Sequence, residues 1–111
     1  MDKKYYFDPA DSDRLIDMED EGESVVHWID DNLSPIKSVN HYHTSYGLKH
    51  IMESDIDLYV TNSQFKEAML ICGYEPHDPS RLNWNFRISK RSPVFVRRAK
   101  ERRDRFSYRR R

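Results

Sequence analysis

The fold is decided by the stretch TNSQFKEAMLICG, residues 61–73. Thr61 and Gln64 have the spacing of a capping box, in which the two side chains satisfy backbone donors that the first helical turn leaves unpaired. The apolar side chains that follow at helical spacing are Phe65, Ala68, Met69 and Cys72. Gly73 then stands where a left-handed residue ends a helix. The stretch therefore predicts a well-bounded amphipathic helix.

Two more helices are expected before this stretch. From residue 23 onward, the apolar residues that recur at helical spacing are Val25, Val26, Trp28, Ile29 and Leu33. Ser34 and Pro35 supply a stop for this helix. Thr44 or Ser45 can cap the next one. Its apolar side consists of Leu48, Ile51 and Met52.

Two stretches have the alternating pattern of β-strands. Residues 56–60, IDLYV, alternate apolar and other side chains over a short length. Residues 82–88, LNWNFRI, alternate strictly, with Leu82, Trp84, Phe86 and Ile88 on one face. The sequence therefore predicts an α+β fold, a small single domain of about three helices with a short two- or three-stranded sheet and charged terminal tails.

The order of these elements is compatible with a helix-turn-helix or winged-helix protein. In that arrangement the helix in residues 61–73 would be the reading helix, with its N-terminal side chains near base edges. A plain amphipathic core helix explains the same pattern and is the simpler interpretation.

The net charge of zero conceals a strong asymmetry along the 111 residues. Residues 1–33 contain 11 acidic and 3 basic side chains, residues 34–75 contain 5 and 3, and residues 76–111 contain 3 and 13. The segment charges are therefore −8, −2 and +10. An asymmetry of this size is typical of interaction tails or of a nucleic-acid-binding surface.

Three regions follow from charge and periodicity: an acidic N-terminal segment (1–22), a compact domain (23–96) and an arginine-rich C-terminal tail (97–111). The first is expected to be mobile or weakly helical, because it is rich in acidic residues and has only a short apolar stripe. The tail is not expected to fold by itself, because most of its side chains are charged.

Several classes of protein do not fit this sequence. No stretch approaches the roughly 20 apolar residues that cross a bilayer, and the first residues lack the apolar run of a signal peptide. A cytoplasmic location is therefore expected. Cys72 is the only cysteine, so an intrachain disulfide, a cysteine-rich zinc site and a CxxC redox pair are excluded.

His41, His43 and His50 suggest a metal site or acid–base catalysis, because neutral imidazole is a good ligand and base. No further cysteine or carboxylate ligands stand at standard spacing, so no metal and no other cofactor is expected. A glycine-rich phosphate loop, a nucleophile elbow and a paired-carboxylate signature are absent, which argues against an enzyme. Catalysis would require a convergent polar pocket near the three histidines.

The arginine-rich tail is the strongest functional signal. A guanidinium group matches phosphate oxygens with a planar fork of donors, and neutralising several phosphates releases condensed counterions. Phe106 and Tyr108 can add stacking on exposed bases. The candidate nucleic-acid contacts are Arg87, Lys90, Arg91, Arg97, Arg98, Lys100, Arg102, Arg103, Arg105, Arg109, Arg110 and Arg111, together with Asn62, Gln64 and Lys66 on the expected exposed side of the capped helix. Alternatives are a tail that folds back on the acidic segment and a targeting tract.

The strings HTSYGLKH (residues 43–50), TNSQFKEAML (61–70) and NWNF (83–86) resemble a group of small, mostly uncharacterised proteins of phages and integrated mobile elements of Gram-positive bacteria. The similarity covers roughly residues 33–89, about half of the chain, and leaves out both charged ends. The resemblance implies a bacterial cytosolic setting and a role in a mobile element, either in DNA transactions or in blocking a host system. It assigns no role to any particular residue.

Together these features predict a nucleic-acid-binding accessory protein of a bacterial mobile element or phage, with DNA and RNA both open as partners. The alternative is a protein-interaction module, an inhibitor or adaptor that docks on a host nucleic-acid-processing protein. In that case the acidic residues 1–31 would mimic a phosphate backbone, and Tyr5, Tyr6 and Phe7 would anchor the complex.

Overall fold

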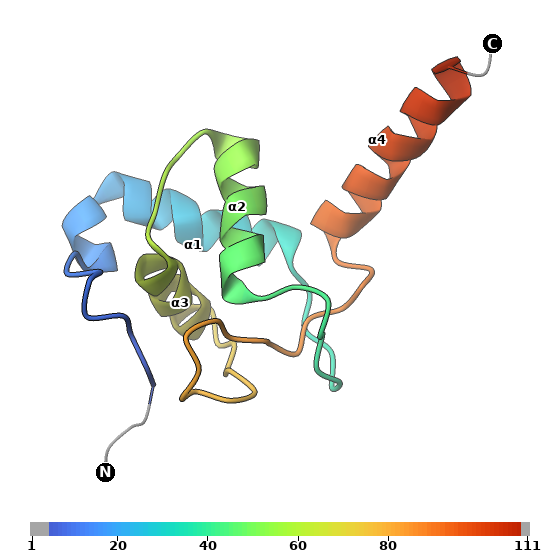
Figure 1. Cartoon of the computed structure of the whole chain (residues 1–111). Coiled ribbons are helices and arrows are strands. Elements are labelled where there is room, and N and C mark those ends of the chain that lie inside the picture. Colours follow the sequence, from blue (N-terminus) through green and yellow to red (C-terminus); the bar gives the residue numbers. More distant parts are fainter. Residues whose placement is uncertain (1–4, 110–111) are drawn as a thin grey trace.

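The computed structural model describes residues 5–109, with side chains described for residues 5–107. In this range one short 3₁₀-helix, η1 (Leu15–Met18), precedes four α-helices: α1 (Asp20–Asn32), α2 (Ser45–Ile56), α3 (Asn62–Ile71) and α4 (Pro93–Arg109) (Figure 1). α3 packs against both α1 and α2, and α4 extends away from this body. None of the described helices is long and apolar enough to cross a membrane.

The α+β prediction is wrong, because residues 5–109 contain no β-strand and therefore no sheet. Two isolated antiparallel bridges, Pro35 with Ile88 and Thr44 with Asn85, are the only β-type pairings in this range. The winged-helix alternative is therefore also wrong for these residues, since a wing is a β-hairpin.

Residues 82–88 are extended, but their backbone pairs with the loop between α1 and α2 only at intervals. Ser45 Oγ accepts a hydrogen bond from Trp84 N at 3.1 Å, and Asn85 Nδ2 donates to Asn40 O at 3.0 Å. Side chains thus occupy backbone donors and acceptors that a regular ladder would use. The segment buries the side chains of Trp84, Phe86 and Ile88, but it does not form a β-strand.

The second expected strand, residues 56–60, is also absent. α2 continues to Ile56, and Asp57 ends it in a left-handed conformation with φ 53°. Glu53 Oε2 accepts a hydrogen bond from Val60 N at 3.0 Å and fixes the connector to α2. The alternation therefore crosses a helix end and its connector, which imitates the period of a strand.

α3 has the two ends that its sequence predicts. Thr61 Oγ1 accepts from Gln64 N at 3.0 Å and Gln64 Oε1 accepts from Thr61 N at 2.9 Å, so the capping box is confirmed. Gly73 has φ 92°, a conformation that favours glycine, and Tyr74 N donates back to Met69 O at 3.0 Å. Local chemistry alone sets the limits of this helix.

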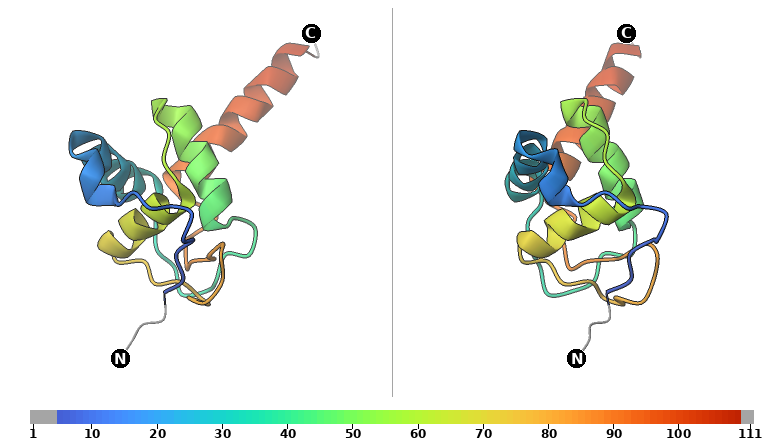
Figure 2. Two further views of the ribbon diagram at one scale, coloured as in Figure 1. Left: turned by 60° about the vertical axis from the view of Figure 1, so that its left-hand side comes forward. Right: turned by 90° about the vertical axis from the view of Figure 1, so that its left-hand side faces the viewer.

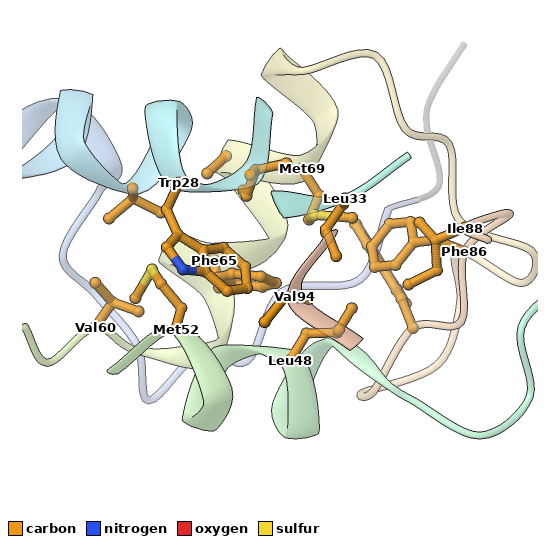
Figure 3. Packing of buried hydrophobic residues seen from close by; sticks show 14 of the residues in the cluster. Trp28, Leu33, Leu48, Met52, Val60, Phe65, Met69, Phe86, Ile88 and Val94 are labelled. Carbon is orange, nitrogen blue, oxygen red and sulfur yellow. The ribbon is translucent and has the colours of Figure 1, made fainter. Parts of the chain in front are cut away.

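The core lies between α1, α2, α3 and the extended residues 82–88 (Figure 3). Its members on the first three α-helices are Val25, Trp28, Ile29, Leu48, Met52, Phe65, Ala68 and Met69. Its remaining members are Leu15, Leu33, Val60, Trp84, Phe86, Ile88 and Val94. Complete burial of a large apolar side chain stabilises a fold by about 1.5–3 kcal/mol. The alternating segment therefore supplies core residues although it forms no sheet.

Residues 5–14, expected to be mobile or weakly helical, form an irregular segment with a turn at residues 9–10, and this segment packs on the domain. The ring centroids of Tyr5 and Phe7 each lie 5.5 Å from that of Trp84. Leu15, in η1, is buried directly after this segment. Aromatic and apolar contacts therefore hold the beginning of the chain despite its acidic composition.

α4 includes the arginine-rich tail as far as Arg109, so the expected boundary between residues 96 and 97 falls inside a helix. Pro93 suits the first helical position, and the Arg, Lys, Ala and Glu residues after it favour helical backbone. Lys100 Nζ and Asp104 Oδ2 form an ion pair at 3.1 Å one helical turn apart. The molecule measures 58 × 31 × 22 Å, and α4 projects from the body in every view (Figure 2).

Candidate nucleic-acid interface

α4 is fixed to the domain by its first turn. Val94 is fully buried in the core. Arg97 donates hydrogen bonds to Asp55 Oδ2 at 2.6 Å and to Asn32 Oδ1 at 2.9 Å, which ties the helix to both α2 and α1. Residues 101–107 are exposed. The beginning of α4 is therefore a structural anchor, and residues 101–107 are presented to solvent.

The charged residues beyond this anchor are segregated around the helix. Because residues three and four apart share a helical side, one side of α4 carries three arginines and an aromatic ring. The members of this side, called the basic face of α4, are Arg98, Arg102, Arg105 and Phe106. Glu101, three residues after Arg98 and four before Arg105, borders this face, whereas Asp104 lies off it and is paired with Lys100. The arrangement leaves a stripe of three guanidinium groups with one carboxylate, that of Glu101, at its edge.

A groove of about 520 Å³, called the basic groove, adjoins this face. Its walls are Asn40, Tyr42 and His43 from the α1–α2 loop, Ile51 from α2, Lys90 from the turn before α4, and Phe95, Arg98 and Arg102 from α4. Lysine and arginine side chains therefore converge with aromatic rings in one hollow, and no carboxylate is among these lining residues. Cations beside exposed rings are the combination that proteins use to bind nucleic-acid strands.

Two ring contacts organise the basic groove. The His43 ring stacks on the Phe95 ring, with centroids 4.3 Å and planes 10° apart. Tyr42 is 78% exposed, and Lys90 Nζ lies 5.3 Å from the centroid of its ring. The second contact is a cation–π interaction. The groove therefore has a packed aromatic pair and one open ring with a cation beside it.

The charge of the groove comes from Lys90, Arg98 and Arg102. Burial lowers the pKa of His43, and the positive charge of Arg98 lowers it further. The imidazole is thus neutral at neutral pH and meets Phe95 as an aromatic ring.

The guanidinium groups of the basic face are not neutralised by the domain. Within residues 5–107, the ion pairs that involve α4 are Arg97 with Asp55 and Lys100 with Asp104. Neither acidic partner belongs to the acidic N-terminal region. In this part of the chain the tail does not fold back on that region, contrary to the alternative considered from the sequence.

The predicted nucleic-acid contacts outside α3 fall into four groups. Those that meet in the basic groove are Lys90, Arg98 and Arg102. Those exposed elsewhere are Arg87, Arg91, Arg103 and Arg105. Those held in ion pairs are Arg97 and Lys100. The side chain of Arg109, and residues Arg110 and Arg111, lie outside the described part of the chain, as does the side chain of Tyr108.

The predicted exposure of Lys66 on α3 is wrong. Lys66 is fully buried, and its Nζ donates to Tyr6 O and, at 3.0 Å, to Leu82 O. The same nitrogen lies 4.1 Å from the ring centroid of Trp84. Burial lowers the pKa of Lys66 to about 8. This lysine therefore fastens the N-terminal segment to the core and is not presented to phosphate.

The other two predicted contacts on α3 also have internal partners. Gln64 is buried and completes the capping box. Asn62 Nδ2 donates to Leu82 O at 3.1 Å and to Asn83 Oδ1 at 3.0 Å. The N-terminal segment and the chain after α3 cover the side that a reading helix would present. The spacing of polar and apolar residues in α3 does not indicate that other segments pack over its polar side.

The three histidines have separate neighbours. The His41 ring meets His77 edge-on at 6.1 Å, and His50 Nδ1 lies 3.2 Å from Glu53 Oε1. His43 belongs to the basic groove. Among the residues that the structure describes, no group of three or more His, Cys, Asp and Glu side chains is placed to hold a metal ion.

Tyr42 and Phe95 are groove residues that the sequence did not assign to a nucleic-acid site. Tyr42 stands between two histidines, which pointed to metal binding, and Phe95 stands at the end of the region expected to form the compact domain. Tyr42 is separated from Arg98 by 56 positions, so no local spacing connects them. An aromatic residue in a polar loop was the only available signal.

A second hollow, called the acidic groove, has a volume of about 440 Å³ and lies between η1, α1 and α3. Two isoleucines in its wall are exposed, Ile16 by 82% and Ile71 by 63%. Its acidic side chains are Glu19, Asp20, Glu23 and Glu67. The molecule therefore has two chemically opposite hollows, one cationic and aromatic, the other acidic and aliphatic.

Comparison of the chain with protein-family models, with curated proteins and with solved structures finds no match.

Proposed function

We propose that this protein binds nucleic acid through the basic face of α4 and the adjoining basic groove, as an accessory protein of a bacterial mobile element or phage. The observation that carries the proposal is the convergence of Lys90, Arg98 and Arg102 in a hollow with no carboxylate among its lining residues. A folded protein that leaves cations in this arrangement has a ready site for phosphate.

The physical basis is electrostatic. Guanidinium groups can donate two parallel hydrogen bonds to a phosphate, and each phosphate that they neutralise releases condensed counterions. Because the basic face continues along α4 through Arg105, it follows a phosphate backbone over more than one nucleotide. α4 keeps these cations in register without disturbing the core, since its residues 101–107 are exposed and none of them belongs to the core.

The test is a salt titration of binding to a fluorescent oligonucleotide, measured by anisotropy. The double variant Arg98→Gln/Arg102→Gln should bind at least about ten-fold more weakly, and the slope of log affinity against log salt should fall by about 0.7–0.9 for each phosphate that the variant no longer neutralises. The matched control is Lys37→Gln/Arg81→Gln, which removes two exposed cations outside the basic groove. Equal weakening in both variants, or no binding by the unaltered protein, would contradict the proposal.

The acidic groove supports a second candidate, a protein-interaction module whose partner presents a cationic helix with an apolar side. Exposed Ile16 and Ile71 supply the apolar contact, and the carboxylates of Glu19, Asp20 and Glu23 would pair with the cations. The anchor expected from sequence is different, since Tyr5 and Phe7 pack on Trp84.

This candidate is tested by capture from a nuclease-treated bacterial lysate. A protein retained by the unaltered chain and by Arg98→Gln/Arg102→Gln, but not by Ile16→Ser/Ile71→Ser, would support docking at the acidic groove. Retention that all variants share, or that disappears with nuclease, would remove this candidate.

A further inference from the structure

Tyr42 is held in an exposed position by the backbone of its loop. Asn40 is buried, and its Oδ1 accepts hydrogen bonds from Tyr42 N at 2.9 Å and from His43 N at 3.2 Å. Asn85 Nδ2 donates to both Asn40 O, at 3.0 Å, and His43 O, at 3.2 Å. The loop that carries the ring is therefore fixed from both sides.

The fixed loop explains why the ring of Tyr42 stays at the surface. A single exposed aromatic residue is ordinary in a folded protein. Tyr42 differs because its ring stands in the wall of the basic groove, with Lys90 beside it and the guanidinium groups of α4 in the same hollow. An aromatic face next to several cations is complementary to a base next to its phosphates.

The state of the nucleic acid follows from the geometry of a base. In a duplex the faces of the bases are stacked on one another, and only their edges and the phosphates are accessible. Stacking on Tyr42 requires a base whose face is free, as in a single strand, a loop or an end. The basic groove, at about 520 Å³, has the size of a pocket for a small ligand and admits an unstacked nucleotide.

We infer that the basic groove binds single-stranded nucleic acid, with one base stacked on Tyr42 and the flanking phosphates on Lys90, Arg98 and Arg102. This inference rests on the proposed function and deepens it. The base supplies stacking that every nucleobase can provide, so the preference is for strand state and not for sequence. Single-stranded DNA and RNA share this chemistry.

The experiment compares four ligands of one length in anisotropy titrations: single-stranded DNA, single-stranded RNA of the same sequence, the DNA duplex, and a DNA strand of abasic sites with the same number of phosphates. We expect at least one of the two single strands to bind more tightly than both the duplex and the abasic strand. The relative affinity of the DNA and RNA strands identifies which of the two the groove prefers.

Tyr42→Leu isolates the stacking contribution. Removing one base–aromatic stack should weaken single-strand binding by about five- to one-hundred-fold and leave binding of the abasic strand unchanged. Tyr42→Phe keeps the aromatic face and should restore the affinity. Because the side chain is exposed, the melting temperature of both variants should equal that of the unaltered protein. A 2-aminopurine base in the strand should be quenched on binding by the unaltered protein and much less by Tyr42→Leu.

Abasic and normal strands of equal affinity would overturn the inference while leaving phosphate binding intact. The same holds if Tyr42→Leu weakens both strands equally. Absence of binding to every ligand would instead refute the proposed function itself, so the two failures are distinguishable.

Discussion

Lys66 in α3 and Arg102 in α4 are both long cationic side chains at positions where the sequence predicts contact with phosphate, yet their surroundings are opposite. Lys66 is fully buried against Trp84, and its Nζ donates hydrogen bonds to Tyr6 O and Leu82 O. Arg102 lies on an exposed helix and borders the basic groove. One cation holds the domain together, and the other is available to a partner.

The difference lies in what covers each helix. The polar side of α3 faces the N-terminal segment and the chain that follows α3, whose carbonyl oxygens accept hydrogen bonds from the lysine. Residues 101–107 of α4 are exposed. A buried ammonium group must be satisfied by hydrogen bonds because its desolvation is unfavourable, whereas an exposed guanidinium keeps its water until a phosphate replaces it. Whether a cation can bind a partner therefore depends less on its residue type than on whether other segments of the chain pack over it.

The largest expected effect is a difference in the free energy of unfolding between a core variant and a variant on the exposed part of α4. Trp84→Ala should lower the free energy of unfolding by about 3–5 kcal/mol, because it removes a fully buried ring that also faces Lys66, Tyr5 and Phe7. Arg105→Ala, on the exposed part of α4, should change it by less than about 0.5 kcal/mol. Urea unfolding followed by circular dichroism measures both. A comparable decrease in the two variants would show that α4 belongs to the fold throughout its length.

An intermediate effect should appear in the pH dependence of stability. Burial lowers the pKa of Lys66 to about 8 from an ordinary value of 10.5, so between these values the unfolded chain binds more protons than the folded one. The free energy of unfolding should therefore rise with pH across this window, by at most about 1.4 kcal/mol per pH unit for one group. Unfolding in urea at pH 7.5, 9 and 10 measures the trend.

Lys66→Met is the control for this pH effect, since other groups also titrate at high pH. The difference in unfolding free energy between the unaltered protein and this variant should shift in favour of the lysine as the pH rises. A constant difference from pH 7.5 to 10 would mean that the ammonium group is not desolvated as its burial indicates.

The smallest expected effect concerns the junction between the regions. Arg97→Ala removes the bonds that tie α4 to Asp55 and Asn32, and should lower the free energy of unfolding by about 0.5–1 kcal/mol, because this pair is partly exposed. Amide hydrogen exchange should accelerate in the first turns of α4. Lys100→Ala removes an exposed pair within the helix and should have a smaller effect. If both variants behave alike, Arg97 is not the anchor of α4.

The parts of the fold that could be predicted are those that depend on residues close together in the sequence. The capping box at Thr61 and Gln64 and the turn at Gly73 each depend on residues only a few positions apart, and both are confirmed. The alternation in residues 82–88 correctly marks Trp84, Phe86 and Ile88 for burial, but Leu82, predicted on the same face, is exposed. It does not specify a sheet, because an extended segment becomes a strand only when a second backbone offers a matching ladder.

The candidate site was predictable only in part. Charge counting singled out the region of Arg98, Arg102 and Arg105, since clustered cations are visible in any sequence. The same reasoning included Lys66, because helical spacing shows which residues share a side and not what lies against that side. Tyr42 could not be assigned from the sequence because the cations that share its groove, Lys90, Arg98 and Arg102, are far from it along the chain.

The sequence by itself determined the ends of α3, the apolar positions that enter the core and the segregation of charge between the two ends of the chain, all of which arise from neighbouring residues. Only the tertiary structure decided that the two alternating segments form no sheet within residues 5–109 and that Lys66 is buried beneath the N-terminal segment. It also decided that Tyr42 lines the same groove as Arg98 and Arg102. Those outcomes depend on which distant backbone and side chains pack together, and the core that brings them together exists only in the folded chain.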